Sequence, residues 1–391
     1  MALVKNLLIN RLGVDILERN KIFHLVTVSK SIPLMKGQIE YLRENNLDVN
    51  VVTSKGEELK VYSSDIVHEI NMEREISLKN DIKSLFKMIK LFLKEKPYIV
   101  NSGTPKAGLI GTVAAFLTRR PVRIYTVRGL RLETVTGIKY KILYLMEKIA
   151  MFCATDIIAI SESLKTRIIE LNLQKEKNIK VLGYGSSNGL ILENFKKEFT
   201  DIPEELAEKL NDYFVIGFVG RIVKDKGIKE VIKSFQIIKE KGYNVKLLIV
   251  GKIEKDNSIS KEDFNFLMND ENIVLAGQVS NTVDYYNHMD VLVFPTYREG
   301  FGNVSIEAQA LGVPVITTNV TGAKDTVIDG ETGYIVPKGD YVDIASKIEK
   351  LLNDSELTET LGNSAIKRVN EKFDSKIIWD DLLKVYREKI K

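Results

Sequence analysis

The sequence has little of what marks a secreted or membrane-spanning protein. Its 391 residues hold a single cysteine, Cys153, so no disulfide can form within the chain, and residues 1–20 carry five charges. Those charges are too many for the apolar core of a secretory signal. The longest uncharged stretch is 16 residues, 308–323, whereas a membrane-spanning helix needs about 20 apolar residues. We therefore expect a cytoplasmic protein.

Metal-binding patterns are also missing. The chain contains no Asp-x-Asp pair, a common way to hold a divalent cation on a diphosphate, and its three histidines, His24, His68 and His288, are far apart in sequence. No Cys/His cluster has zinc-ligand spacing. We expect these histidines to lie in strands or on the surface. The sequence predicts neither a metal cofactor nor a nucleic-acid partner.

Charge is distributed unevenly along the chain. Residues 1–190 hold 30 Lys and Arg against 19 Asp and Glu, a balance of +11, and residues 191–391 hold 27 against 34, a balance of −7. The first half should favour anionic partners such as lipid headgroups or pyrophosphates. Ordinary drift in surface charge is an equally good explanation at this point.

Short β-branched runs alternate with helical patterns through both halves of the chain. Such alternation predicts an α/β fold with parallel, doubly wound sheets, and the length predicts two Rossmann-like domains facing a cleft, where ligands of such folds bind. We expect an N-terminal domain over 1–190, a second domain over 191–374, a linker near 184–212, and a final helix, 375–391, that packs back on the first domain through Trp379. Strands are expected at 22–29, 48–54, 98–102, 122–127, 156–161 and 179–183, then at 213–220, 245–251, 272–277, 290–296 and 313–318. Helices are expected at 33–45, 78–95, 105–118, 138–154 and 162–173, then at 227–241, 280–289, 303–311, 340–353 and 356–371.

The strongest chemical signal is REGFGNVSIEAQALGVPVI, residues 298–316. It places Glu299 and Glu307 on either side of a glycine-containing loop, with Asn303 at the start of the predicted helix. Glycines allow close approach of a ligand, and the amides at a helix start bind phosphate. Glu307 could accept hydrogen bonds from ribose and Glu299 from a sugar ring. A strand-loop-helix connection with incidental acids is the alternative.

A second signal is FVGRIVKDKGI, residues 218–228. Arg221 follows a predicted strand, and Lys226 precedes a glycine at a helix start. A guanidinium and an ammonium beside backbone amides suit a diphosphate and would stabilise the charge on a departing nucleoside diphosphate. A solvated basic turn is the alternative.

The order of these motifs, with Gly277 and Val279 between them, resembles the retaining GT-B glycosyltransferases of family 4, especially bacterial members that build surface polysaccharides. The resemblance covers nearly the whole chain and is most specific over 217–336. It implies that Arg221, Lys226 and Glu299 act on the diphosphate and the transferred sugar, and that Glu307 holds the ribose. The remaining donor-binding residues that it implies are Gly37, Val279, Gly300, Phe301, Gly302, Asn303 and Val304.

The first half resembles the acceptor domain of the same family. Relatives often have a His-x-His pair where this chain has Asn101 and Gly103, and often a histidine where it has Arg128. The group that deprotonates the acceptor is therefore undefined. Cations in RGLRLETVTGIKYK, residues 128–141, suit an acceptor pyrophosphate, and a basic surface loop is the alternative. The residues expected at the acceptor are Arg128, Arg131, Lys139, Ser186 and Asn188.

The predicted helix at 78–96 has two faces. Five lysines at positions 79, 83, 87, 90 and 94 fall within about 80° of arc, beside an apolar stripe. A basic amphipathic helix can lie on an anionic membrane surface, although a packed helix with solvated lysines is the simpler explanation for this helix alone.

These features together predict a glycosyltransferase that moves a hexose or N-acetylhexosamine from a UDP-sugar to a polyprenyl-diphosphate-linked or other glycan acceptor. The alternatives are a nucleotide-sugar epimerase, a phosphorylase, or a non-catalytic UDP-sugar-binding protein on the same fold. An epimerase would act without an acceptor, a phosphorylase would need inorganic phosphate, and a binding protein would show no turnover.

Overall fold

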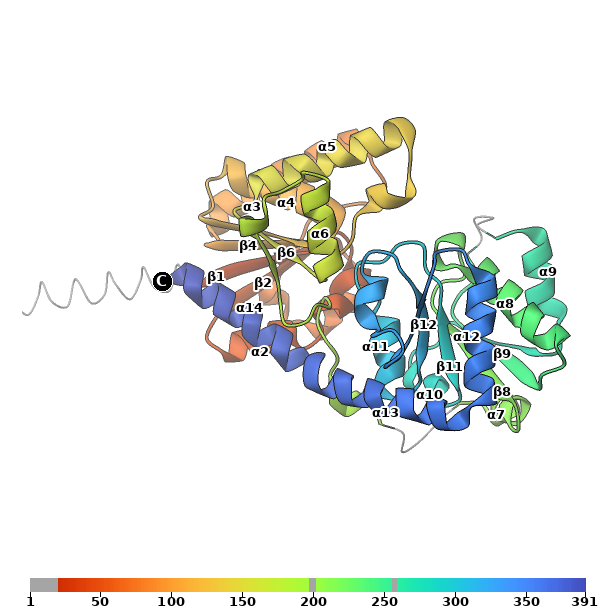
Figure 1. Ribbon diagram of the computed structural model, residues 1–391. Coiled ribbons are helices and arrows are strands. Elements are labelled where there is room, and N and C mark those ends of the chain that lie inside the picture. The colour runs from red at the N-terminus through yellow and green to blue at the C-terminus, as the bar shows by residue number, and fades with distance from the viewer. Residues whose placement is uncertain (1–19, 197–201, 255–258) are drawn as a thin grey trace, which may run out of the picture. The chain divides into compact units, whose positions relative to one another are not determined.

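The computed structural model describes residues 20–196, 202–254 and 259–391 (Figure 1). The chain divides into two compact units. Unit 1 comprises the described residues up to Asn188 together with Ser375–Lys391, and unit 2 comprises those within Gly189–Asp374. Among the described residues, no helix is both long and apolar enough to cross a bilayer.

Unit 1 is built on a parallel sheet of seven described strands in the order β3-β2-β1-β4-β5-β6-β7. The strands are β1 Lys21–Leu25, β2 Asp48–Thr53, β3 Val67–Glu69, β4 Ile99–Gly103, β5 Val122–Val127, β6 Asp156–Ala159 and β7 Ile179–Val181. Its helices are α2 Gln38–Glu44, α3 Leu78–Glu95, α4 Pro105–Leu117, α5 Gly137–Cys153, α6 Glu162–Glu170 and α14 Ser375–Ile390.

Unit 2 repeats this plan with a parallel sheet of six described strands in the order β10-β9-β8-β11-β12-β13. The strands are β8 Phe214–Val219, β9 Val245–Val250, β10 Ile273–Gly277, β11 Val291–Phe294, β12 Val315–Thr318 and β13 Gly333–Val336. Its helices are α7 Glu204–Leu210, α8 Ile228–Glu240, α9 Lys261–Asn269, α10 Val283–Tyr286, α11 Asn303–Ala310, α12 Tyr341–Asn353 and α13 Ser355–Lys372.

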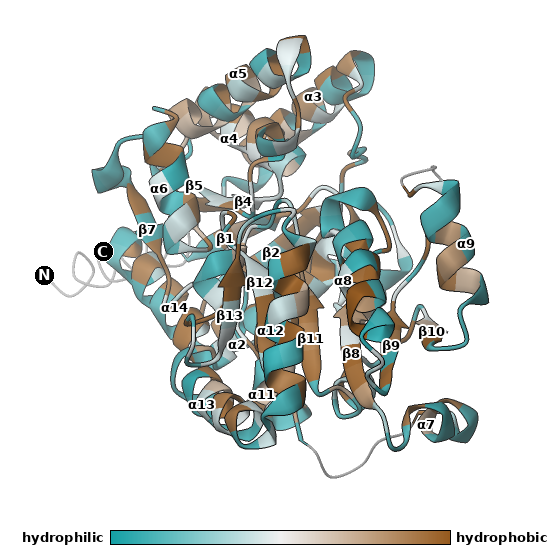
Figure 2. Ribbon diagram, turned by 45° about the vertical axis from the view of Figure 1, so that its right-hand side comes forward, coloured by the Kyte–Doolittle hydropathy of each residue, from teal (hydrophilic) through white to brown (hydrophobic). Residues whose placement is uncertain are grey.

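The central strands of both sheets, β1 and β4 in unit 1 and β8 and β11 in unit 2, are buried along almost their whole length, because helices cover both faces of a parallel sheet. In unit 2, β9 is buried at every position, and residues from β8, β9, β11, α8 and α12 form one hydrophobic cluster. Figure 2 shows the strands of unit 2 in hydrophobic colours, whereas α8 and α12 present hydrophilic residues on the side away from the sheet. The predicted α/β class and doubly wound sheets are confirmed.

Two sequence predictions differ from the structure near the sheet edges and turns. The helix predicted at 33–45 is divided: Ser29–Met35 forms a 3₁₀ helix that contains Pro33, and α2 begins only at Gln38. Gly37 lies between the two segments with a φ of 77°, a left-handed conformation that a continuous helix cannot contain and that glycine adopts easily. The segment assigned to a linker, 184–212, contains helix α7. The boundary between the two units lies near the beginning of this segment, after Asn188.

The last helix, α14, packs in unit 1 beside α2 (Figure 1). Trp379 and Tyr386 are buried, and the Trp379 Nε1 donates to Asn188 Oδ1 at 2.8 Å. Asp381 Oδ2 accepts from the Gly183 amide at 2.8 Å. Residues near the end of the chain therefore complete the core of the unit that contains its beginning.

Candidate functional site

The candidate donor site lies at the point where the strand order of unit 2 reverses. From β8 the chain continues to β9 on one side, and β11 lies on the other side. Ligands of open α/β sheets bind outside the carboxyl ends of the strands at such a switch point. The loops that follow β8 and β11 meet there, since Tyr297 N donates to Asp225 O at 2.9 Å and Thr296 Oγ1 donates to the same oxygen at 3.2 Å.

Two helices start at this edge on glycines in the left-handed region. Gly227 (φ 76°) precedes α8, and Gly302 (φ 96°) precedes α11. A side chain at Gly227 would collide with the Pro295 carbonyl, and one at Gly302 would meet the Phe294 ring at 2.8 Å. Neither helix start is capped by a side chain. The positive ends of two helix dipoles therefore point at the same loops, an arrangement that favours a bound anion.

The loops bring together the two residues that the sequence assigned most specifically. Lys226 Nζ forms a hydrogen-bonded ion pair with Glu299 Oε2, and both side chains are about four-fifths buried. The Lys226 ammonium also lies 5.6 Å from the centre of the Phe294 ring. The pairing fixes a carboxylate and a cation, from two different loops, beside both helix starts.

Arg221 lies at the same edge, one residue beyond the Gly220 that follows β8, but its guanidinium does not join this pair. It contacts Glu254 instead, with Nη1 3.1 Å from Oε1, and 58% of the side chain is exposed. The sequence placed Arg221 and Lys226 on one diphosphate. Because exposed ion pairs contribute little to stability, the contact with Glu254 is one that a bound diphosphate could replace.

Glu307 lies in the middle of α11, where it accepts a hydrogen bond from the hydroxyl of Tyr286, with 2.9 Å between the oxygens. Burial raises the pKa of Glu307, and the bond from Tyr286 opposes that shift. Burial also raises the pKa of Tyr286 well above its usual value. The sequence did not assign Tyr286; its position in a predicted helix far from the motif gave no sign of it.

Of the other predicted donor residues, some lie at the start of α11 and others pack against the core of unit 2. Asn303 and Val304 form the first turn of α11, where backbone amides point out of the helix. Phe301, by contrast, is 1% exposed and packs on Phe373 with 5.4 Å between ring centres, so its side chain fixes the loop and only its backbone remains for a ligand. Val279 is half-buried against the core cluster of unit 2.

Gly300 is packed tightly by the next loop, which follows β12. A side chain at Gly322 would come within 2.5 Å of the Gly300 carbonyl, so both backbones need the close approach. The hydroxyl of Tyr297 donates to Glu230 Oε1 of α8 at 2.7 Å, and this bond, together with burial, raises the pKa of Tyr297 to about 12. Sequence analysis assigned neither Gly322 nor Tyr297, because both contacts join segments that are distant in sequence.

Unit 1 reverses its strand order between β1 and β4, and a small cavity of about 20 Å³ lies there. Its polar wall is a chain of buried hydrogen bonds. Asn101 Nδ2 donates to Tyr386 Oη at 2.7 Å, Tyr386 Oη lies 2.7 Å from His24 Nε2, and Thr126 Oγ1 donates to Asn101 Oδ1 at 2.7 Å. Burial and the nearby Arg128 lower the pKa of His24 to about 3. His24 is therefore neutral at physiological pH and lies in a strand, as the sequence predicted.

Arg128 is the cation of this cavity. Its Nε donates to Ser187 Oγ at 2.5 Å, and its guanidinium lies against Gly103, where a side chain would overlap it. Burial lowers the pKa of Arg128 to about 10, so it remains charged near neutral pH. The glycine at position 103 therefore leaves room for the Arg128 side chain.

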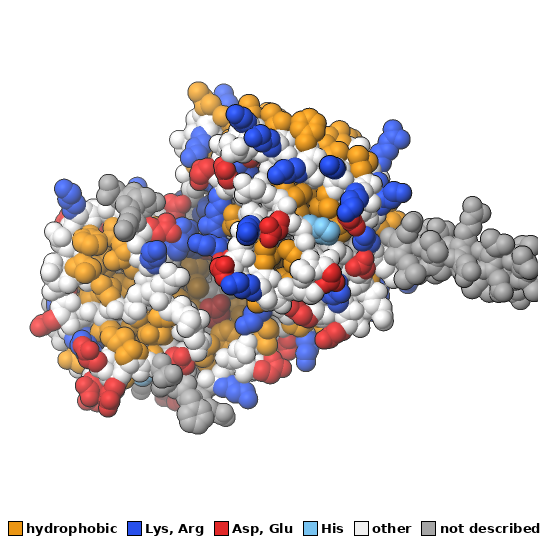
Figure 3. All heavy atoms as spheres, turned by 180° about the vertical axis from the view of Figure 1, so that it is seen from behind, with side chains coloured by type: hydrophobic (Ala, Val, Ile, Leu, Met, Phe, Trp, Pro, Cys, Tyr) orange, Lys and Arg blue, Asp and Glu red, His pale blue; other side chains and the backbone are white. Residues whose placement is uncertain are grey.

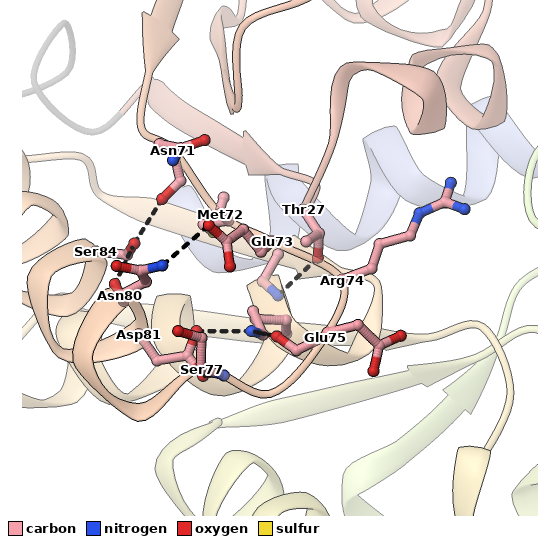
Figure 4. A network of polar contacts seen from close by, with 12 residues as sticks. Thr27, Asn71, Met72, Glu73, Arg74, Glu75, Ser77, Asn80, Asp81 and Ser84 are labelled. Atoms are coloured by element: carbon pink, nitrogen blue, oxygen red, sulfur yellow. Dashed lines mark hydrogen bonds and ion pairs between the residues drawn. The ribbon is translucent and has the colours of Figure 1, made fainter.

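Two further acceptor candidates, Arg131 and Lys139, lie in the loop after β5 and at the start of α5. Arg131 Nη1 donates to the Arg74 carbonyl at 3.3 Å, and Lys139 is exposed near the start of α5. Arg74 belongs to a loop that is tied to α3 and α4: Asn80 Nδ2 donates to Glu73 Oε1 at 3.0 Å (Figure 4), and the buried Lys106, which pairs with Asp81 at 2.6 Å, also donates to the Glu75 carbonyl. These bonds hold the loop that carries Arg74.

Ser186 and Asn188, the other two acceptor candidates, lie in the segment 186–188. Ser186 is buried and has a positive φ of 83°, so its place in the loop is fixed by the fold. Asn188 Oδ1 accepts from Trp379 Nε1 and from Gln38 Nε2 at 3.2 Å, and its Nδ2 donates to the Lys36 carbonyl at 2.8 Å. These bonds join α14 to the start of α2 through Asn188, and the assignment of Ser186 and Asn188 to the acceptor stays a prediction.

Gly37, predicted to approach the donor, is the residue before α2 in unit 1. Within the described part of the chain, no group of three or more His, Cys, Asp or Glu side chains could hold a metal ion.

Comparisons with known proteins agree with this arrangement. The model of the family "Glycosyl transferase 4-like" matches residues 21–161, and that of "Glycosyl transferases group 1" matches residues 199–368. The capsular polysaccharide biosynthesis glycosyltransferase CapM of Staphylococcus aureus is 64% identical over 375 residues, which are 96% of this chain and 99% of that protein. A UDP-Gal:alpha-D-GlcNAc-diphosphoundecaprenol alpha-1,3-galactosyltransferase of Escherichia coli is 28% identical, over 87% of this chain and 90% of its own.

Solved structures show the same fold. The Anabaena protein Alr3699/HepE, crystallised with UDP and glucose, superposes with a TM-score of 0.76 at 18% identity, over 94% of this chain and 99% of that one. The sucrose-phosphate synthase of Thermosynechococcus elongatus superposes with a TM-score of 0.75 at 22% identity, over 94% and 98%. With a relative 64% identical along nearly its whole length, this chain belongs to the GT-B glycosyltransferases of family 4.

Proposed function

We propose that this glycosyltransferase acts in surface-polysaccharide synthesis and transfers a hexose or N-acetylhexosamine, with retention of configuration, from a UDP-sugar to a polyprenyl-diphosphate-linked glycan. The name of the Staphylococcus aureus relative supports the pathway, and that of the Escherichia coli relative supports both substrate classes. The crystallised complex of the Anabaena protein with UDP supports the nucleotide.

The observation that carries the proposal is the Lys226–Glu299 pair beside the starts of α8 and α11, each of which follows a left-handed glycine. A diphosphate placed there receives the positive ends of α8 and α11 and the Lys226 ammonium, and Arg221 can turn to it from Glu254. This positive field stabilises the negative charge that develops on the leaving group. In this proposal these groups supply the positive charge that a metal cofactor supplies in other enzymes.

Each acid has a separate task. Glu299, freed from Lys226 as the diphosphate arrives, accepts hydrogen bonds from the sugar hydroxyls and fixes the ring. Glu307, oriented by Tyr286, holds the ribose. Because Glu299 is hydrogen-bonded to the sugar hydroxyls in this scheme, it is not the group that bonds to C1. In the proposed step the bond from C1 to the diphosphate oxygen breaks with its electron pair on the diphosphate. The acceptor oxygen bonds to C1 on that same face, and the acceptor proton passes to the diphosphate.

The acceptor diphosphate binds to the cations of unit 1 in this scheme. Arg128 is charged, anchored by Ser187, and lies at the switch point of its sheet, and Arg131 and Lys139 extend the positive charge along the following loop and helix. Because Arg128 is protonated near neutral pH, it cannot accept the proton of the acceptor hydroxyl. The proposal therefore assigns that proton to the leaving diphosphate.

A panel of UDP-sugars tests the proposal. Slow release of UDP from one sugar without acceptor, faster release with a lipid-linked acceptor, and equal rates with and without EDTA are expected. The anomeric configuration of the product, read by NMR coupling constants, would refute retention if it were inverted. Isomerised UDP-sugar with no UDP release would instead identify an epimerase, and turnover that needs inorganic phosphate would identify a phosphorylase.

A further inference from the structure

Three helices of unit 1 form a layer whose outward side is unusually apolar. In this layer α3 packs on α4, and α4 packs on α5. The exposed large apolar side chains of α3 are Leu78, Ile82, Phe86 and Leu93; those of α4 are Phe116 and Leu117; and those of α5 are Ile138, Ile142, Leu145, Ile149 and Phe152. Soluble proteins scatter such residues singly, whereas a contiguous group marks an interaction surface.

Helix α5 carries two apolar stripes. The inner one, with Leu143 and Ala150, is buried. The outer one consists of residues 138, 142, 145, 149 and 152, whose spacing of four and three residues confines them to about 80° of arc. Ile138 is 78% exposed and Phe152 is 73% exposed. A helix that is apolar on its solvent side as well as on its core side needs a second apolar environment.

Helix α3 places charge beside the same kind of stripe. Its buried residues are Ser84, Met88 and Phe92. The exposed residues Leu78, Ile82, Phe86 and Leu93 form one outward stripe, and the exposed lysines 79, 83, 87, 90 and 94 form the next. The rings of Phe116 and Phe152, 6.1 Å apart, join α4 to α5. We call the eleven apolar residues and these five lysines, with Lys139 and Lys141 of α5, the basic apolar face.

Of the three acidic side chains on these helices, only that of Glu95 contacts one of the lysines, Lys94 at 3.3 Å. Asp81 pairs with the buried Lys106, Glu95 pairs with Lys21 at 2.8 Å, and Glu147 is buried against the Tyr125 hydroxyl at 3.0 Å. Figure 3 shows hydrophobic and Lys or Arg side chains together at the top of the view, the end at which α5 lies in Figure 1. The face is thus apolar and positively charged at once.

We propose that the basic apolar face docks on an anionic phospholipid bilayer, with the stripe of α5 and the neighbouring residues of α3 and α4 in the headgroup region and the lysines on the phosphates. Amphipathic helices with apolar and Lys-rich sides bind membranes in this way. A second copy of this chain fits the face poorly, because a two-fold interface would bring one lysine stripe against the same stripe of its partner.

The face is connected to the acceptor candidates. Helix α5 begins six residues after Arg131, and α3 follows the loop that carries Arg74. Docking would therefore hold these cations near lipid headgroups. The inference does not depend on the proposed reaction, since vesicle binding needs neither donor nor acceptor.

Co-sedimentation with vesicles tests the docking. The full-length protein should sediment with vesicles of phosphatidylglycerol and phosphatidylcholine and much less with phosphatidylcholine alone. The triple variant I138S/L145S/F152S should reduce binding to anionic vesicles more than tenfold. The matched control F264S/M268S/V342S, which changes three exposed apolar residues of unit 2, should bind as the unchanged protein does. Circular dichroism melting checks that both variants are folded.

Charge is tested separately. The variant K83Q/K87Q/K90Q should weaken binding about a hundredfold, because each lysine near an anionic surface contributes roughly a factor of five. The control K229Q/K261Q/K367Q alters three exposed lysines of unit 2 and should have no effect. High salt should remove the contribution of the lysines and leave a weaker, apolar one.

Absence of binding to anionic vesicles, or equal binding by the face variants and their controls, would overturn the proposal. Light scattering adds a distinct outcome: a dimer that becomes monomeric in I138S/L145S/F152S, together with no vesicle binding, would assign the face to a second copy of the chain. UDP release without acceptor, measured on the same samples, reports separately on the proposed reaction.

Discussion

The candidate sites of the two units lie at the same topological position, the switch point of each sheet, but their side chains differ in charge. In unit 2 the switch point holds paired charges, Lys226 with Glu299, between two glycine-started helices. In unit 1 it holds a neutral chain, His24, Tyr386 and Asn101, with one cation, Arg128. The sheet determines where a ligand can bind, and the loops at its edge determine what that ligand can be.

A second comparison limits what a perturbed pKa can show. Each unit contains a glutamate that accepts a hydrogen bond from a buried tyrosine, Glu307 from Tyr286 at 2.9 Å and Glu147 from Tyr125 at 3.0 Å. Burial raises the pKa of both acids. Only Glu307 belongs to a site motif, whereas Glu147 lies under the basic apolar face. The location of a group, more than its pKa, separates a functional acid from a structural one.

The largest effect is expected at the charged switch point. Glu299→Gln keeps the size of the side chain but removes the charge that pairs with Lys226, so turnover should fall by about 10²- to 10³-fold, the usual loss for a preorganised electrostatic contact. Initial rates of UDP release measure this. Glu254→Gln, which frees Arg221 from its exposed partner, is the control and should leave the rate within about twofold. Normal turnover by the Glu299→Gln enzyme would show that the Lys226–Glu299 pair is not needed for the reaction.

Next in size is the cost of losing the glycine that starts α8. Gly227→Ala should destabilise the protein by about 3 kcal/mol, because the added carbon collides with the Pro295 carbonyl in a left-handed backbone. Gly242, beyond the other end of α8, has a φ of 84° and nothing within 4 Å of the added carbon. Gly242→Ala should therefore cost only about 1 kcal/mol. Urea unfolding measures both, and equal losses would show that the close approach is unimportant.

A third prediction sharpens the difference between the units. Arg128→Ala should raise the KM for a lipid-linked acceptor about tenfold or more, since an anion loses its charged partner. Its affinity for UDP, measured by calorimetry, should be unchanged because the donor candidates other than Gly37 lie in unit 2. Arg128→Lys keeps the charge but lacks the guanidinium fork, so its KM for the acceptor should lie between those of the unchanged enzyme and Arg128→Ala. Weaker UDP binding would contradict the assignment of Arg128 to the acceptor.

The smallest effect concerns the two glutamate–tyrosine pairs. The pKa of Glu147 rises from 4.5 to about 7 in the folded state, so the folded protein binds more protons than the unfolded chain between these values. Stability should then fall as pH rises through this window, and the loss should persist above it. Glu147→Gln should add about 1–3 kcal/mol to the free energy of unfolding at pH 8 and little at pH 4.

Urea titrations at both pH values measure this change. Glu307→Gln should shift stability in the same direction and should also weaken UDP binding, which Glu147→Gln should leave intact. A loss of UDP binding in Glu147→Gln would show that the comparison between the two acids is wrong.

Much of the fold could be predicted from the sequence, because buried parallel strands are short apolar runs separated by helices. The prediction missed two edge strands: β3, VHE, which has no fully buried residue, and β13, GYIV, whose three apolar residues lie between a glycine and a proline. It missed α9, KEDFNFLMN, because that helix buries little beyond Leu267.

The site was partly predictable for the same physical reasons. Lys226, Glu299 and the glycines lie in contiguous motifs, which sequence displays directly. Tyr286, Tyr386 and Ser187 reach their partners from segments 21, 362 and 59 residues away, and no local pattern indicates such contacts. The apolar residues of the outer stripe of α5 recur in the sequence at spacings of four and three. Sequence alone did not separate them from the apolar residues of the inner stripe, because only the exposure of each side chain distinguishes the two stripes.

The return of α14 to unit 1 makes unit 2 an uninterrupted insert. Its two ends are held together, with Leu190 N donating to Phe373 O at 2.7 Å beside a bridge from Leu190 to Asp374. A gene segment that encodes 189–374 could thus be replaced by that of a relative through two cuts at adjacent points, without dividing either hydrophobic core. Such an exchange would replace the whole candidate donor site while unit 1 is inherited unchanged.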